Sequence, residues 1–197
     1  FRFKQRVWYL KDSETVFNGC STGCNVKVYF NKEGLFRVKP QHNADVNGYW
    51  MCDEGRDVYK FVNREARQLK AAKFEKGAWT QDISAGAAAT ELANTLKETK
   101  PEEMALVLTG QNTVEEYEAI VSTFVNKFKS KNIFHWWPQE SNAKDFDGLL
   151  IRGDKNPNTA GLKKVLQAHG ISNSWSGLET LLNSGNLKQL VVFGPEN

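Results

Sequence analysis

The chain has 197 residues, with 26 lysines and arginines against 23 aspartates and glutamates, and so a formal net charge of +3. Hydrophobic residues make up 40% of the sequence and charged residues 25%, values that exclude disordered, collagen-like and disulfide-rich proteins. The longest uninterrupted apolar run, Met104 to Leu108, has five residues, whereas a membrane-spanning helix needs about 20. We therefore expect no membrane-spanning segment. The net charge is also too small and too dispersed to indicate nucleic-acid binding.

Residues 1–65 predict a small β-rich unit. Apolar and polar residues alternate from Asn25 to Phe30, a turn follows at 31–34, and the alternation resumes at Phe36 and Val38. This pattern predicts a β-hairpin with a glycine-containing loop. A short helix is expected at 52–62.

From about residue 80 the hydrophobic period becomes helical. Asp82 is expected to cap a helix that runs to Lys97, and the almost entirely apolar stretch 104–109 predicts a strand buried on both faces. Thr113 followed by Glu116 is a capping box, which predicts the start of the next helix.

The remainder of the chain alternates between strand and helix patterns. Further strands are expected at 133–136, 148–152 and 190–193, and helices at 158–169 and 176–182. Such alternation predicts a Rossmann-like α/β domain with a mostly parallel sheet. Because the chain lacks an initiator methionine and stops just after a predicted strand, we expect it to be part of a longer polypeptide.

The three cysteines, Cys20, Cys24 and Cys52, flank the β-rich unit. The chain opens without an export signal, so free thiols or metal ligands are expected rather than a disulfide. Three thiolates could bind an iron–sulfur cluster, but a cubane cluster takes four ligands, so the set is one short. Burial as small apolar side chains is the alternative interpretation of these cysteines. His42 is the candidate for a substitute ligand.

Other catalytic signatures are missing from the sequence. There is no Gly-x-Ser-x-Gly elbow, no phosphate-binding loop and no Gly-x-Gly-x-x-Gly after a strand. We therefore assign no catalytic residue and no nicotinamide-binding residue to this chain.

Five stretches carry a family resemblance: Phe1–Leu10, Gly19–Asn25, Arg37–Pro40, Val46–Arg56 and Asp147–Thr159. They resemble the large iron–sulfur subunit of bacterial NADH:quinone oxidoreductase (respiratory complex I). That family is similar to the molybdopterin-dependent oxidoreductases. The resemblance implies a small β-rich unit of the 4Fe-4S molybdopterin-oxidoreductase type at 1–65, with a degenerate cysteine motif. It also implies a molybdopterin-oxidoreductase-like α/β domain at 66–197, truncated at its C-terminus.

The resemblance also implies a metal centre. In the family, a 4Fe-4S cluster is held by a Cys-x2-Cys-x3-Cys pattern and a distant cysteine before Gly-Arg. Cys20, Cys24 and Cys52 match the last three ligand positions, and Phe17 stands at the first. We expect no intact 4Fe-4S cluster here, because phenylalanine cannot bind iron. The site is then expected to be empty, and the alternative is a 3Fe-4S cluster held by the three cysteines. Glu54 stands where active molybdenum enzymes commonly have a lysine, so no molybdopterin is expected.

The function implied by this resemblance is that of a structural and vestigial redox module. It would lie in the cytoplasmic peripheral arm of complex I, at the inner face of the cell membrane, with other subunits of the complex as partners and only an indirect link to the membrane. The isolated chain is expected to be inactive. Two alternatives stay open: a domain of a formate dehydrogenase-like molybdoenzyme, and a small metal-binding module fused to an unrelated α/β domain.

Overall fold

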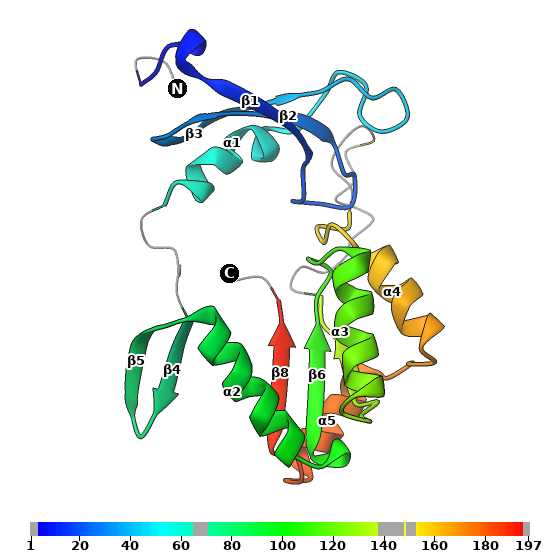
Figure 1. The fold of residues 1–197 in the computed structure, drawn as a ribbon. Coiled ribbons are helices and arrows are strands. Elements are labelled where there is room, and N and C mark those ends of the chain that lie inside the picture. The colour runs from blue at the N-terminus through cyan, green and yellow to red at the C-terminus, as the bar shows by residue number, and fades with distance from the viewer. Residues whose placement is uncertain (1–3, 65–70, 138–147, 149–152, 195–197) are drawn as a thin grey trace.

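The structure is a computed structural model that describes residues 4–64, 71–137, 148 and 153–194. An N-terminal antiparallel sheet and a parallel sheet lie at opposite ends of the view in Figure 1, and a two-stranded hairpin lies beside the helix that follows it in the chain. None of the helices within these described ranges is long and apolar enough to cross a membrane.

The N-terminal sheet has the strand order β1-β2-β3. After a short 3-10 helix, η1 (Val7–Tyr9), the strands are β1 (Lys11–Val16), β2 (Asn25–Asn31) and β3 (Gly34–Pro40). The predicted hairpin is confirmed as the antiparallel pair β2–β3. β1 was not predicted, because all six of its residues are exposed and carry no apolar alternation.

Helix α1 (Asp53–Val62) covers this sheet next to β3 (Figure 1). It confirms the short helix expected at 52–62, with Cys52 as the residue that caps its N-terminus. The apolar core beneath it contains the buried residues Phe17, Cys24, Val26, Val38 and Met51. Two of the predicted site positions therefore belong to the core of the N-terminal unit.

The next elements correct one prediction. A hairpin of β4 (Ala71–Glu75) and β5 (Ala78–Ile83) turns at Lys76 and Gly77, whose φ angles are 52° and 81°. Asp82 lies in β5, so the prediction that it caps a helix is wrong. Helix α2 (Ala85–Glu98) begins instead after Ser84, whose Oγ accepts a hydrogen bond from the Ala87 amide.

The parallel sheet has the order β7-β6-β8. After the 3-10 helix η2 (Pro101–Glu103), its strands are β6 (Met104–Leu108), β7 (Ile133–His135) and β8 (Gln189–Phe193), and β6 pairs in parallel with both neighbours. All five residues of β6 are buried, as the apolar run predicted. The α/β class is thus confirmed. The predicted mostly parallel sheet is confirmed in part, as the three parallel strands among the described residues. Apart from Gly148, the strand expected at 148–152 lies outside the described residues.

Helices pack on both faces of this sheet. The capping box of Thr113 and Glu116 is confirmed at the start of α3 (Val114–Asn126). Residues of α3 and α4 (Thr159–Ala168), with Leu96 of α2, form the main core against one face of β6. Leu178 of α5 (Trp175–Asn183) packs against Ala105 and Val107 on the other face. This layered arrangement buries β6 completely.

Candidate metal centre

The three cysteines come from two segments of the N-terminal unit. Pairing of Val16 with Asn25 brings the ends of the loop 17–24 together, and this loop carries Cys20 and Cys24. Cys52 immediately precedes α1. All three are free thiols; Cys20 and Cys24 are buried and Cys52 is half-buried. Residues that are distant in sequence are therefore gathered beneath one sheet.

The thiols interact with each other and with nearby polar groups. Burial raises the pKa of the Cys24 thiol, and the neighbouring Cys20 and Cys52 raise it further. The Cys20 thiol donates to Thr22 Oγ1 over 3.4 Å, and Cys52 Sγ accepts from the Gly55 amide over 3.4 Å. Because the thiolate is the form that binds a metal, the raised pKa means that Cys24 is protonated at neutral pH when no metal is bound.

Phe17 fills space inside this site. Its side chain is only 8% exposed, and its amide donates to the Cys24 carbonyl over 2.8 Å. A Cβ atom at Gly19 would lie 2.2 Å from Cζ of Phe17, and one at Gly55 would lie 3.5 Å from Cδ1 of the same ring. The ring is therefore packed between the cysteine loop and α1, and glycines border it on both sides.

The donor set does not fit a cubane cluster held by four thiolates. Three cysteines are present, and Phe17, at the first of the four ligand positions that the resemblance implies, is an aromatic core residue. Within the described part of the chain, no three His, Cys, Asp or Glu side chains form a group that could hold a metal ion. His42, the proposed substitute ligand, is exposed and stacks on Tyr49 with 4.2 Å between ring centroids. The assignment of Cys20, Cys24 and Cys52 as metal-ligand positions stays a prediction.

The segment that leads into α4 contacts the cysteine unit. The Ser21 amide, between two of the cysteines, donates to the Asp154 carbonyl over 3.0 Å. Lys155 Nζ lies 3.8 Å from Glu54 Oε2, in the first turn of α1. These contacts leave no local signal in the sequence, because their partners are far apart along the chain. They join the N-terminal unit to the α/β part.

The same segment is attached to the parallel sheet. Asn156 is almost fully buried, and its amide donates to Asp154 Oδ1 over 2.9 Å. The Asn158 amide donates to the carbonyl of Gly110, which follows β6, over 2.8 Å, and Asn158 also caps α4. A Cβ atom at Gly110 would lie 2.7 Å from Cβ of Asn156. The connection between the cysteine loop and the sheet is therefore a closely packed turn.

The comparisons with known proteins match both parts of the chain. Residues 13–64 match the family "Molybdopterin oxidoreductase Fe4S4 domain". The chain is 39% identical over 62 residues to the G subunit of NADH-quinone oxidoreductase from Pseudomonas fluorescens, covering 32% of this chain and 7% of that protein. It is 32% identical over 153 residues to the mitochondrial NADH-ubiquinone oxidoreductase 78 kDa subunit of Candida albicans, covering 75% of this chain and 20% of that protein.

A plant relative gives a similar alignment. The mitochondrial NADH dehydrogenase [ubiquinone] iron-sulfur protein 1 of Solanum tuberosum is 29% identical over 134 residues, covering 68% of this chain and 18% of that protein. The matches thus span between 7% and 20% of the length of these three relatives. The predicted resemblance is confirmed: the chain is similar to a segment of the G subunit of NADH-quinone oxidoreductase and to segments of the two mitochondrial proteins. The Fe4S4 domain match includes all three cysteines and Phe17.

Proposed function

We propose that this chain is a structural segment of the large iron–sulfur subunit in an NADH:quinone oxidoreductase, with an iron–sulfur site that has lost one ligand. The parent enzyme would pass electrons from NADH to quinone through centres held elsewhere. The units 1–65 and 66–197 would be a degenerate 4Fe-4S-type unit and a molybdopterin-oxidoreductase-like α/β domain. Other subunits of the same enzyme would be its partners, in the peripheral arm at the inner face of the membrane.

The packing of Phe17 carries this proposal. A 4Fe-4S cluster requires a fourth ligand at the position that the family resemblance gives to residue 17. There the chain has an aromatic ring that is 8% exposed and lies between Gly19 and Gly55. Burying a phenylalanine side chain contributes about 1.5–3 kcal/mol to stability. The ring would thus supply packing where family members have a cluster, and Cys20, Cys24 and Cys52 would serve as small apolar core residues.

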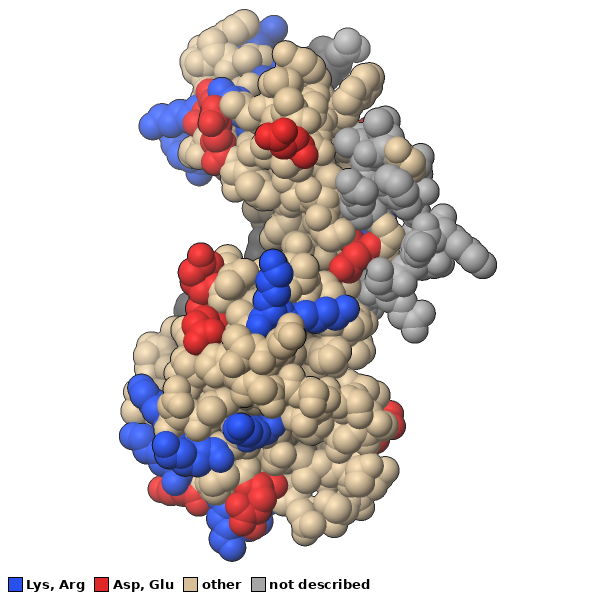
Figure 2. Space-filling view, turned by 90° about the vertical axis from the view of Figure 1, so that its right-hand side faces the viewer, with Lys and Arg blue, Asp and Glu red and all other residues tan. Residues whose placement is uncertain are grey.

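The contacts of Asp154 and Lys155 support a structural role for the whole chain. They join the cysteine loop and α1 to a turn that is itself packed against the end of β6. On the face shown in Figure 2, lysines and arginines are interspersed with aspartates and glutamates over both parts of the molecule. A mixed surface of this kind suits contacts with other proteins better than contacts with the uniformly charged nucleic-acid backbone.

Anaerobic reconstitution of the full 197-residue chain with iron and sulfide tests the proposal. Iron and acid-labile sulfide per chain should stay well below the roughly four of each in a cubane cluster. Phe17→Cys supplies the missing thiol and should gain iron, sulfide and visible absorption. Its melting temperature should rise on reconstitution, because metal binding and folding are thermodynamically linked.

Phe17→Ala is the matched control, since it opens the same space without adding a thiol. It should not gain a stable cluster. A full cluster in the wild type would contradict the structural role, and so would a stable three-iron cluster, because three thiols would then suffice. If Phe17→Cys and Phe17→Ala behave alike, residue 17 does not decide cluster binding and the proposal loses its main support.

A further inference from the structure

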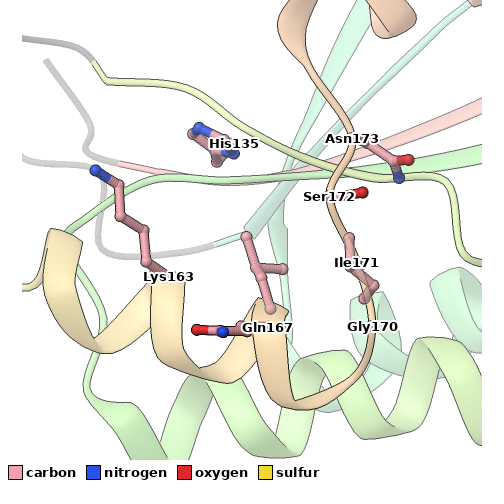
Figure 3. A pocket seen from close by; sticks show the side chains of 8 residues that line it. His135, Lys163, Gln167, Gly170, Ile171, Ser172 and Asn173 are labelled. Atoms are coloured by element: carbon pink, nitrogen blue, oxygen red, sulfur yellow. The ribbon is translucent and has the colours of Figure 1, made fainter.

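A cavity of about 420 Å³ lies beside the parallel sheet, away from the cysteines. It is bordered by His135, the last residue of β7, by α4, and by the loop that follows α4 (Figure 3). Its apolar wall comes from Leu166 and Ile171, which belong to the buried core. Its volume is within the range of about 300–1,000 Å³ that is usual for small-molecule sites.

The loop that borders this cavity is fixed to the sheet. Asn173 Nδ2 donates to the Lys131 carbonyl over 2.7 Å and to the Ile133 carbonyl over 3.0 Å. The Ile171 amide donates to the Leu166 carbonyl over 2.9 Å, which closes the end of α4. The cavity is thus formed by the fold itself, so that a ligand would not have to order this loop.

One end of the cavity is rich in hydrogen-bond donors and carries positive charge. Lys163 and His135 lie at the same end in Figure 3, and Trp137 joins them: its ring centroid is 4.7 Å from that of His135 and 5.6 Å from Lys163 Nζ. Gln167, one helical turn after Lys163, adds an amide. No carboxylate is among the described residues that line the cavity.

The positive charge at this end has no counter-charge among the described residues. Lys163 takes part in none of the ion pairs that the described residues form. A lysine and a histidine next to an apolar wall, with no acidic neighbour, are complementary to a negatively charged ligand. This arrangement plays no part in the function proposed for the cysteine unit.

We propose that this cavity binds a small anion that carries a phosphate or carboxylate group. Lys163 would supply the charge, His135 one ring N–H, and Gln167 an amide donor, while Leu166 and Ile171 would contact the apolar part of the ligand. Phosphate and carboxylate share the chemistry that these groups recognise. The test therefore has one arm for each, inorganic phosphate and succinate.

Binding is measured by NMR on the full chain, at constant pH and constant ionic strength. The ring signals of His135, assigned by comparison with His135→Gln, are followed as phosphate or succinate is added. The expected result is a saturable shift with at least one of the two anions. Lys163→Ala should weaken binding by on the order of tenfold, as expected for loss of one charged hydrogen bond.

Two further variants make the test specific. Lys164→Ala removes the adjacent exposed lysine on the same helix, which does not line the cavity, and should leave binding unchanged. Gln167→Glu places a carboxylate in the cavity at an exposed helical position and should abolish binding. A shift that does not saturate, or an equal loss in Lys163→Ala and Lys164→Ala, would overturn the proposal, since either result means only general attraction of anions to a basic surface.

Discussion

The ring of Phe17 lies so close to Gly19 that a Cβ atom at residue 19 would be 2.2 Å from its Cζ. The ring is buried in the core of the N-terminal unit, so it cannot move aside freely. We predict that Gly19→Ala lowers the free energy of unfolding by about 1–3 kcal/mol, the usual cost of overpacking. Urea denaturation measures this change.

A double-mutant cycle separates this contact from other effects at residue 19. In a Phe17→Ala background the ring is absent, so the additional cost of Gly19→Ala should fall close to zero. Gly86→Ala is the control, because a Cβ atom there meets nothing within 4 Å; it should leave stability unchanged or raise it slightly. Equal costs for Gly19→Ala in both backgrounds would show that Phe17 is not the residue it meets.

Asn47 organises the loop between β3 and α1. It is 4% exposed, its Oδ1 accepts from the Asn25 amide over 3.0 Å, and its Nδ2 donates to the carbonyls of Gln41 (3.2 Å) and Trp50 (2.9 Å). Asn47→Ala should lower the free energy of unfolding by about 1–3 kcal/mol, because buried polar groups lose their partners.

Asn47→Asp should be at least as destabilising, since a carboxylate oxygen would face those two carbonyl oxygens. Asn186→Ala, at an exposed position before β8, is the control and should change stability by no more than about 0.5 kcal/mol. A thermal melt of Asn47→Ala that overlays the wild type would refute the role assigned to Asn47.

His135 should make stability depend on pH. Burial lowers its pKa, and Lys163 on α4, the charged group that faces it, lowers it further. The unfolded chain therefore takes up a proton at a higher pH than the folded chain does. Stability should fall as the pH decreases through the ordinary histidine pKa and stop falling below the folded pKa.

Two variants check this assignment. Comparison of the wild type with His135→Gln between about pH 8 and about pH 5 isolates the contribution of this residue. Lys163→Met should raise the pKa of His135, as followed by NMR, and should reduce the acid-dependent loss of stability. An unchanged His135 pKa in Lys163→Met would mean that burial alone sets it.

Part of the fold was predictable because short sequence patterns specify it. The capping box of Thr113 and Glu116 specifies the start of α3 by side chains three residues apart, and the apolar run of β6 needs no partner to be recognised. In contrast, β1 is fully exposed and is a strand because it pairs with β2. At the start of α2, Asp82 and Ser84 are both good capping residues, and the pairing of β4 with β5 decides in favour of Ser84.

The residue types of the candidate site could be predicted from the sequence, but the packing of these residues could not. Spacing and resemblance pointed to Cys20, Cys24, Cys52 and Phe17. That the Phe17 ring lies between Gly19 and Gly55 depends on how the loop meets α1 in space. The ion pair of Glu54 with Lys155 likewise joins segments that only the tertiary fold brings together. Long-range contacts of this kind leave no periodic signal in a single sequence.

The chain alone should not accept electrons from NADH. The sequence has no dinucleotide-binding fingerprint, and hydride transfer from NADH is usually taken by a two-electron acceptor such as a flavin. The wild-type chain should therefore oxidise NADH with an artificial acceptor only at the background rate. Even Phe17→Cys carrying a reconstituted cluster should be bleached by dithionite and left unchanged by NADH, because a single iron–sulfur centre accepts one electron. Stopped-flow absorption with each reductant makes this comparison. Turnover of NADH by the purified chain without a flavin-bearing partner would show that the chain has a nicotinamide site of its own, contrary to the structural role proposed for it.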